Sequence, residues 1–404
     1  MAPGGLALLC SNEVLPTNAD GVMGFKQNSD LFYLCGIDQE DTILFIYPDH
    51  VQKQNREVLF IRETNEHLKT WEGEKLTKDE AREISGIETV FWTDQFDTFL
   101  KRNVAEASFL YLNNNEHDGR NKNFISKSDH FNEQIKKEFS LFTIQRLAPI
   151  LSSLRMIKEP EEITQIKEAL KITRKGFERL ADKMKPEIAE YELEAHLTHE
   201  FLINRSRGHA FPPIMASGKN ACVLHYITNN EVCIDGDLIL MDFGAEYANY
   251  NADITRCLPV NGTFNNRQKE VYQAVLNVFH FAKERMVKGN TLEGLRRETA
   301  QKMTEELTKL GLLKVNSEED PAAFRKYFPH SVSHHLGLDV HDVGSRHEPF
   351  KPGMVLTCEP GIYIQEEGLG IRLENDILIT EKGNIDLCED IPLEIVDIEK
   401  MMNS

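Results

Sequence analysis

Short apolar runs bounded by polar residues mark the first part of the chain. Residues 41–47, 57–61 and 108–112 each hold such a run, which predicts a strand, and residues 79–84 have the pattern of a helix. Strands that alternate with helices favour a small α/β fold. We therefore predict an N-terminal α/β domain over residues 1–150.

Amphipathic helices become prominent after residue 150. Glu159-Pro160-Glu161-Glu162 is a good helix start, because proline and acidic residues suit the first turn. Apolar side chains then recur three and four residues apart up to residue 180. Similar helical patterns cover residues 186–201, 267–286 and 291–310, and strand-like patterns cover residues 237–247, 250–258, 355–359, 361–365 and 370–380. This mixture predicts an α+β domain built on an antiparallel sheet over residues 151–404.

Charge and composition narrow the class of protein. The formal net charge is −19, from 65 acidic and 46 basic residues, which argues against a nucleic-acid partner because phosphate binding needs a surplus of Lys and Arg. The seven cysteines are scattered and never spaced as C-x-x-C, which favours a reducing, cytoplasmic compartment. No run of 18 apolar residues occurs and the first basic residue is Lys26, so we expect neither a membrane span nor a secretory signal.

Two aspartates lie on a predicted hairpin. If the chain turns at Tyr247 and Ala248, Asp242 falls opposite Asp253, with Cβ atoms about 4.5–5.5 Å apart. Two such carboxylates repel each other unless a cation lies between them, and a pair of metal ions about 3.5–4 Å apart fits this gap. Either aspartate alone is better explained as a turn former or an exposed strand residue. The apolar run before Asp242 weakens that explanation, because a buried carboxylate needs a partner.

Later strands carry further charged residues. Glu359 ends a predicted strand immediately before Pro360, so the turn would hold its carboxylate at the strand end. Arg372 and Glu374 are two positions apart and therefore share one face of a predicted strand. An arginine beside a metal-bound carboxylate can orient it and lower its proton affinity. In isolation, the same two residues would form an ordinary surface ion pair.

Four of the 14 histidines fall within twelve residues: His330, His334, His335 and His341. His330 and His334 share a face whether this stretch is a strand or a helix. Spacing does not decide between His334 and His335 as a metal ligand. His225 is a fifth candidate, although a lone histidine is more often a structural residue.

Two aspartates, two glutamates and one histidine make an oxygen-rich ligand set. Such a set suits Mn²⁺, Co²⁺, Fe²⁺ or Zn²⁺ in a two-metal site, and it differs from the cysteine-rich pattern of structural zinc. Four carboxylates also balance the charge of two divalent cations.

The order and spacing of these motifs resemble the aminopeptidase P and prolidase family, the proline-directed branch of the pita-bread metallopeptidases. The resemblance extends over nearly the whole chain and rests on residues 28–36 (NSDLFYLCG), 71–73 (WEG), 154–158 (LRMIK), 224–226 (LHY), 241–247 (MDFGAEY), 253–256 (DITR), 333–342 (SHHLGLDVHD), 359–361 (EPG) and 372–374 (RLE). It implies a C-terminal pita-bread catalytic domain, with a curved antiparallel sheet covered by helices. A smaller creatinase/prolidase-like α/β domain would precede it.

Carried over position by position, the resemblance implies five metal ligands, which are Asp242, Asp253, His334, Glu359 and Glu374. Asp253 and Glu374 match the carboxylates that bridge both metals, and Glu359 also matches the general base. The remaining implied site residues are Arg372 beside the bridging glutamate and His225, His330, His341 and Tyr363 around the substrate.

The implied activity is two-metal hydrolysis of the bond between an N-terminal residue and a following proline. Proline lacks an N–H and has a fixed φ, so a pocket that accepts a tertiary amide can select it. The family further implies two divalent ions per chain, which we predict to be Mn²⁺, with Co²⁺, Zn²⁺ and Fe²⁺ as alternatives. It also implies a homo-oligomer, a dimer or a tetramer, with Trp71 as a candidate contact.

Two other interpretations stay open. A prolidase would accept only Xaa-Pro dipeptides, although Ser333 and residues 28–30 look more like aminopeptidase P. A non-catalytic pita-bread binding protein is the second alternative, although all five ligand positions carry suitable residues in this chain. Cleavage of a tripeptide or longer peptide would indicate an aminopeptidase P, and cleavage of dipeptides alone would indicate a prolidase. Absence of both hydrolysis and bound divalent metal would indicate the binding protein.

Overall fold

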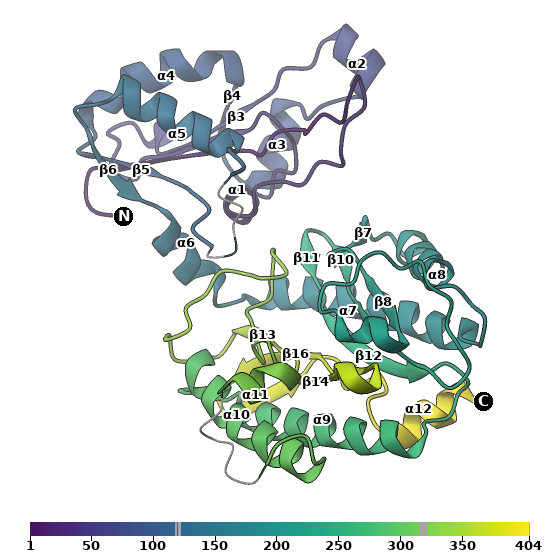
Figure 1. Ribbon diagram of the computed structural model, residues 1–404. Coiled ribbons are helices and arrows are strands. Elements are labelled where there is room, and N and C mark those ends of the chain that lie inside the picture. Colours follow the sequence, from purple (N-terminus) through teal and green to yellow (C-terminus); the bar gives the residue numbers. More distant parts are fainter. Residues whose placement is uncertain (118, 120–122, 315–320, 404) are drawn as a thin grey trace. The chain divides into compact units, whose positions relative to one another are not determined.

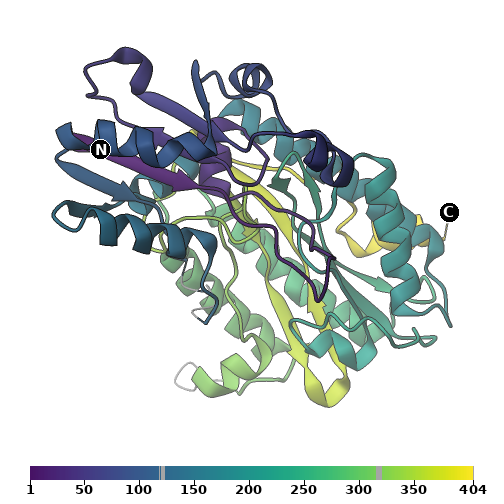
Figure 2. The same cartoon turned by 90° about the horizontal axis from the view of Figure 1, so that it is seen from above.

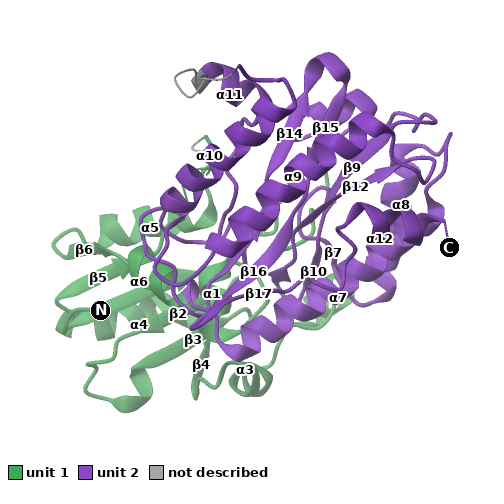
Figure 3. Ribbon diagram, turned by 90° about the horizontal axis from the view of Figure 1, so that it is seen from below, with its two compact units in different colours: residues 1–154 green, residues 155–404 purple. Residues whose placement is uncertain are grey.

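The computed structural model describes residues 1–117, 119, 123–314 and 321–403 (Figure 1). The chain forms two compact units, Met1–Leu154 and Arg155–Ser404 (Figure 3), here called unit 1 and unit 2. Among the described residues, none of the helices combines the length and the apolar character needed to cross a bilayer.

Unit 1 is built on a six-stranded mixed sheet with the order β4-β3-β2-β1-β5-β6. Its strands are β1 (Gly5–Cys10), β2 (Ile43–Ile46), β3 (Glu57–Ile61), β4 (Thr89–Trp92), β5 (Phe109–Leu112) and β6 (Thr143–Arg146). Its helices are α1 (Ser29–Cys35), α2 (Glu66–Glu72), α3 (Lys78–Ser85), α4 (Phe96–Asn103), α5 (Lys127–Glu138) and α6 (Ala148–Arg155). The strands and the helix predicted in this part of the chain are all present.

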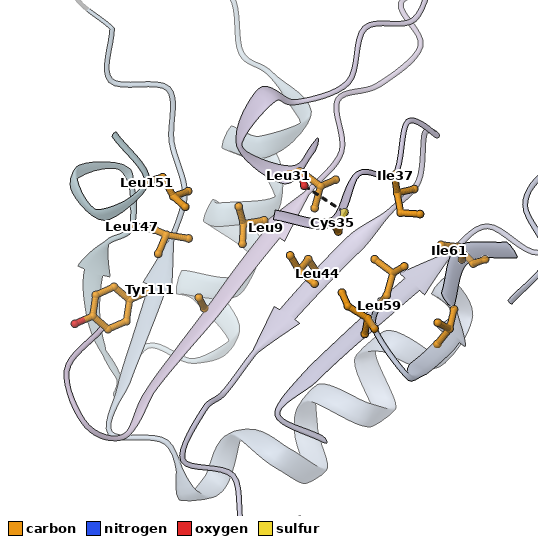
Figure 4. Close-up of a cluster of buried hydrophobic side chains, with 14 residues drawn as sticks. Leu9, Leu31, Cys35, Ile37, Leu44, Leu59, Ile61, Tyr111, Leu147 and Leu151 are labelled. Carbon is orange, nitrogen blue, oxygen red and sulfur yellow. Dashed lines mark hydrogen bonds between the residues drawn. The ribbon is translucent and has the colours of Figure 1, made fainter. Parts of the chain in front are cut away.

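Both faces of this sheet are buried at its centre, which explains why β1, β2 and β3 are almost continuously apolar. Side chains alternate between the two faces of a strand. Leu9, Leu44 and Leu59 join a cluster on one face, to which α1 contributes Leu31 and Cys35 (Figure 4). Neighbouring residues such as Leu8, Phe45 and Phe60 join a second cluster on the other face. A sheet covered on both sides needs no polar face, so its sequence does not alternate strictly.

Unit 2 contains two long helix pairs. Its helices are α7 (Pro160–Lys183), α8 (Glu190–Ile203), α9 (Asn266–Arg285), α10 (Leu292–Lys309), α11 (Pro321–Tyr327) and α12 (Ile395–Met402). The start of α7 is stabilised because the Glu162 carboxylate accepts the backbone N–H of Glu159. The pattern predicted a helix from residue 186, but α8 begins at Glu190. Glu187 has a φ of 71°, which lies outside the helical region.

The strands of unit 2 form small antiparallel sheets, ordered β11-β10-β7, β12-β9-β8 and β13-β16-β17, with a β14-β15 hairpin. They are β7 (Gly208–His209), β8 (Ile214–Ser217), β9 (Leu238–Phe243), β10 (Ala245–Tyr247), β11 (Tyr250–Asn251), β12 (Ile254–Pro259), β13 (Val355–Cys358), β14 (Gly361–Ile364), β15 (Leu369–Arg372), β16 (Asn375–Thr380) and β17 (Gly383–Asp386). The helices α7 and α8 pack against β7, β8, β10 and β11, and α9 packs against β13, β14 and β15. Figures 1 and 2 show these helices and strands from two sides. A bridge between Thr255 and Glu374 links β12 to the start of β16.

The hairpin that carries the two aspartates has a different register from the predicted one. Its turn residues are Ala248 and Asn249, with φ values of 51° and 69°, and Asp242 pairs with Thr255 rather than with Asp253. Two positive φ values give a two-residue turn whose twist matches that of the strands. The prediction was therefore wrong by two residues. A shift of two keeps every side chain on its face, so Asp242 and Asp253 still point to the same side.

Gly244 lies at the break between β9 and β10, opposite the backbone of Ala252 in the other arm of this hairpin. A Cβ at this position would lie 1.7 Å from the carbonyl oxygen of Ala252. Any larger residue would push apart the arms that bear Asp242 and Asp253. The glycine in the MDFG motif is thus a packing requirement of the site.

Candidate metal centre

The five candidate ligands come from separate segments of unit 2. Asp242 lies in β9, Asp253 directly before β12, and Glu359 directly after β13, whereas His334 and Glu374 lie between strands. Ligand atoms of Asp253, His334 and Glu374 all lie within 4.8 Å of one another. His334 Nε2 is 3.5 Å from Asp253 Oδ2 and 3.7 Å from Glu359 Oε1. The fold therefore gathers carboxylates around one imidazole nitrogen.

The structure turns His334, and not His335, toward these carboxylates. His334 Nδ1 lies 3.0 Å from the carbonyl oxygen of His335. A ring that donates its Nδ1–H to a carbonyl presents Nε2 as the free lone pair, which is the usual arrangement of a metal-binding histidine. His335 is buried and packs so tightly that a Cβ at Gly344 would lie 1.9 Å from its ring. Burial lowers the pKa of His335 to about 3, so this ring is neutral.

Two threonines that sequence reasoning missed hold the carboxylates in place. Thr255 Oγ1 donates to Glu374 Oε2 at 2.6 Å and accepts from Arg372 Nε at 3.0 Å. Thr357 Oγ1 accepts the backbone N–H of His334 at 3.1 Å and lies 3.4 Å from Glu359 Oε1. Each threonine is two positions from a candidate ligand. The period of a strand could have pointed to both, because residues two apart share a face.

Arg372 lies at the centre of the charged network. Its guanidinium donates to the Asp242 carboxylate, to the Tyr363 hydroxyl at 2.8 Å and to Thr255. The sequence placed Arg372 and Glu374 on one continuous strand, but the chain leaves β15 at Arg372 and enters β16 at Asn375. The prediction of a shared strand was wrong, although both side chains reach the same threonine. The break lets the chain pass from one sheet to the next.

Tyr363 and His330 form a directed hydrogen-bond chain with Arg372. Because Arg372 donates to the Tyr363 oxygen, the tyrosine proton points to His330 Nε2, 2.8 Å away. His330 Nδ1 lies 2.7 Å from the carbonyl oxygen of Ser331, so this nitrogen carries the ring proton. Burial, followed by the charge of Arg372, lowers the pKa of His330 to about 3. His330 is therefore neutral, and it lies 3.7 Å from Glu359.

The two other candidate histidines lie at the periphery of the cluster. The His341 ring stacks on His334, with centroids 4.1 Å apart and planes 25° apart. His225 is an exposed residue of the segment that follows the short helix η4 (Gly218–Cys222). It lies close enough to His330 for its charge to lower the pKa of that ring.

The electrostatics of the cluster favour bound cations. Burial raises the pKa values of Asp253, Glu359 and Glu374, and the negative charge of Asp242 raises all three further. Asp242 Oδ1 is buried and has no hydrogen-bond partner among the described residues. A buried carboxylate oxygen without a partner is costly, and like charges at this density repel each other. Oxygen donors with a single imidazole match the preferences of divalent transition metals. The residues therefore fit divalent cations.

Two more buried charged residues, Arg256 and Asp376, hold the backbone beside the candidate ligands, and sequence reasoning missed both. Arg256 is fully buried and donates to the carbonyl oxygens of Thr255 and Glu374 and to the Asn375 side chain. Asp376 accepts the backbone N–H of Asp253 at 3.1 Å. The contacts of Arg256 with Glu374 and Asn375, and that of Asp376 with Asp253, join residues more than 100 positions apart. No local sequence signal reports them.

Comparison with known proteins places the chain in a family. Residues 164–381 match metallopeptidase family M24, and residues 1–111 match the aminopeptidase P N-terminal domain. The chain belongs to metallopeptidase family M24. Membership makes it a peptidase that depends on divalent metal, and the predicted family is confirmed.

The relatives match almost end to end. The Xaa-Pro aminopeptidase of Haemophilus influenzae is 35% identical over 100% of this chain and 94% of its own length. That of Escherichia coli is 34% identical, with the same shares covered. The structure of zinc-substituted E. coli aminopeptidase P in complex with product has a TM-score of 0.90 and 33% identity, and the match covers 100% of this chain and 95% of that one. The predicted fold class is confirmed by this likeness.

His334→Ala and His335→Ala are expected to differ in metal content. Removing His334 takes away the imidazole whose Nε2 lies 3.5 Å from Asp253 and 3.7 Å from Glu359, so the variant should hold about one divalent ion fewer per chain. Removing His335 leaves every carboxylate contact in place, so its metal content should equal that of the wild type. Elemental analysis of both variants, dialysed against the same metal buffer, measures this. The reverse pattern would make His335 the ligand.

Proposed function

We propose that this protein is an Xaa-Pro aminopeptidase, which hydrolyses the peptide bond between an N-terminal residue and a following proline. The observation that carries the proposal is the gathering of Asp253, Glu359 and Glu374 around His334, with Asp242 held beside them by Arg372. The full-length similarity to proteins named Xaa-Pro aminopeptidase supports it.

The proposed ligands of two divalent ions are Asp242, Asp253, His334, Glu359 and Glu374, with Mn²⁺ as the proposed metal. Bound divalent ions in such a centre polarise a substrate carbonyl and lower the pKa of water to near neutrality. The donor set also accepts Co²⁺, Zn²⁺ and Fe²⁺, so the choice among them depends on availability as well as affinity.

The protein groups around the ligands have distinct proposed roles. Glu359 has a carboxylate that burial shifts toward holding a proton, which suits a general base that accepts the proton of attacking water. Arg372 keeps Asp242 and, through Thr255, Glu374 in orientation. Tyr363 and neutral His330 line the site as a fixed hydrogen-bonded pair. His225 and His341 are the proposed contacts to the substrate.

We further propose that residues 1–150 form an N-terminal domain, that residues 151–404 form the catalytic domain, and that the chain assembles as a dimer or tetramer. A cytoplasmic location is part of the proposal. All seven cysteines are free thiols and buried, as a reducing compartment would allow.

A series of Xaa-Pro peptides of increasing length tests the proposed activity. The protein is freed of metal, reloaded with Mn²⁺, Co²⁺, Zn²⁺ or Fe²⁺, and incubated with Xaa-Pro dipeptides, tripeptides and pentapeptides, and products are identified by mass spectrometry. We expect release of the first residue from tripeptides and longer peptides, and none when alanine replaces proline. Activity confined to dipeptides would identify a prolidase, and absence of both hydrolysis and bound metal would indicate a binding protein.

A further inference from the structure

Glu190 is a buried carboxylate that none of the proposed chemistry uses. It is the first residue of α8 and has no exposed surface. Its two oxygens accept four hydrogen bonds, and all four donors are neutral. They are Ser217 N–H (2.8 Å), Asn220 Nδ2 (3.2 Å), the Tyr226 hydroxyl (2.7 Å) and Glu231 N–H (3.0 Å). A carboxylate buried without a cation has to be satisfied in this way.

The four donors bracket the segment that carries His225. Ser217 and Asn220 precede His225 in the chain, and Glu231 follows it. Tyr226 is the residue directly after His225. Burial, followed by the hydrogen bond to Glu190 and then by the Glu190 charge, raises the pKa of Tyr226 to about 12, so the hydroxyl keeps its proton and donates. His225 itself is exposed, with no place in the core of unit 2. Its position depends on the anchors of its segment.

Other contacts hold the two ends of the same segment. Gln365 Nε2 donates to the Cys222 carbonyl at 2.9 Å, which attaches the start of the segment to the end of β14. Asn229, near its end, is buried and donates to Glu194 and to the Pro213 carbonyl. Glu190 is the contact that reaches both ends and the middle.

The carboxylate is itself held rigidly. α8 buries Leu193, Leu197 and Phe201, and it packs closely on α7, where a Cβ at Gly176 would lie 2.5 Å from Leu197 and 2.8 Å from Phe201. Glu190 thus fixes the exposed segment around His225 to the packed helix pair α7 and α8. A reacting group presented from a loop needs this kind of support, because small misplacements cost rate.

We propose that Glu190 is a positioning residue for His225, acting through Tyr226 and the backbone of the segment that presents His225 to the peptide substrate. The proposal rests on the proposed aminopeptidase function. It concerns a residue outside the metal centre, and it assigns a role in the reaction to the start of α8.

Glu190→Gln tests the proposal with an isosteric change. The amide NH₂ has to face one of the two pairs of donors. Tyr226 and Asn220 can reorient, but the backbone N–H of Ser217 or Glu231 cannot, so one anchor of the segment is lost. We expect kcat/KM on an Xaa-Pro tripeptide to fall by about tenfold or more, because displacements of about 1 Å can cost on the order of 100-fold. Tyr226→Phe, which removes one donor only, should show a smaller loss in the same direction.

A double-mutant cycle with His225→Ala separates positioning from a general effect on folding. If Glu190 acts through His225, Glu190→Gln should change kcat/KM by less than about threefold in the His225→Ala background, because residues that act as one unit are not additive. Matched controls are Glu306→Gln, another buried glutamate, and Tyr272→Phe, which removes the hydroxyl bonded to the Leu393 carbonyl. Both should keep kcat/KM within about twofold of the wild type.

The outcomes are distinct. A wild-type protein without activity on any Xaa-Pro peptide would contradict the proposed function and not the role of Glu190. If the wild type is active, an unchanged kcat/KM in Glu190→Gln would overturn the role of Glu190. An equal loss of kcat/KM in the wild-type and His225→Ala backgrounds would overturn it as well. If Glu190→Gln fails to fold, the same cycle run with Tyr226→Phe decides. Metal content is measured in every variant, so that losses from an empty centre are recognised.

Discussion

Glu359→Gln is expected to reduce kcat by about 10²–10⁴-fold, the range typical of removing a general acid or base. Glutamine keeps the shape of the side chain and can still accept from Thr357, but it cannot take up a proton from water. The carboxylate also lies 3.7 Å from His334 Nε2, so its charge contributes to the proposed metal centre. The measurement is kcat on an Xaa-Pro tripeptide, at a metal concentration that saturates the variant.

Metal loading has to be controlled in this experiment, because loss of an ion would mimic loss of the base. Bound metal per chain and the melting temperature are compared with those of Glu306→Gln, which removes a charge from a buried glutamate on α10. A fully loaded, folded Glu359→Gln variant with wild-type kcat would remove Glu359 from the catalytic role. A variant that recovers activity at higher metal concentration would leave it as a ligand only.

Asp342→Asn is expected to lower the stability of unit 2 by about 3–5 kcal/mol. Asp342 is buried, and its carboxylate accepts from Arg155 and from Lys158 Nζ at 2.9 Å, both of which are buried too. Asparagine removes the negative charge that the buried Lys158 and Arg155 share, although Asp339 still pairs with Arg155. Losing one partner of a buried ion pair costs more than the pair itself contributes. A loss of this size corresponds to a melting temperature lower by about 10 °C. Thermal and urea unfolding followed by circular dichroism measure it.

Asp339→Asn is the matched control for that variant. Asp339 shares the partner Arg155 and lies in the same loop, but its side chain is 41% exposed whereas that of Asp342 is 1% exposed. Exposed ion pairs contribute about 0–1 kcal/mol, so this variant should unfold almost like the wild type. Equal losses in the two variants would show that burial of the Asp342 cluster contributes little.

The ion pairs of Asp342 with Lys158 and Arg155 should make the stability of the fold depend on pH. Although burial by itself raises the pKa of Asp342, the charges of Lys158 and Arg155 outweigh burial and lower it to about 2, from an ordinary value of 3.8. Because the folded pKa is the lower one, the ionised group stabilises the fold above about pH 4, and this contribution is lost as the pH falls toward 2. It amounts to about 2 kcal/mol. The difference in the free energy of unfolding between the wild type and Asp342→Asn should therefore shrink as the pH falls from about 4 to 2. A difference that stays constant over this range would contradict the assignment.

The residues of the candidate centre were accessible from the sequence because their types and order are distinctive. Asp242 follows the apolar run of residues 238–241, which is unusual for a carboxylate and points to a partner. The elements were equally accessible, since apolar periods of two and near 3.6 report which face is buried. For β3 the predicted limits are those observed.

Tertiary structure alone decided how these residues meet. The hairpin register depended on positive φ at Ala248 and Asn249, and no glycine marks that turn. Spacing left open whether His334 or His335 is the ligand. In the structure, His334 directs Nδ1 to a carbonyl oxygen and Nε2 to the carboxylates, whereas His335 packs against Gly344.

Sequence by itself determined the family, the elements and the chemical identity of the candidate ligands, because these follow from local patterns. The supports at Arg256, Asp376 and Glu190 were decided only by the fold. Their partners lie tens to more than a hundred residues away, and a hydrogen bond across such a distance in the chain leaves no periodic trace in either segment.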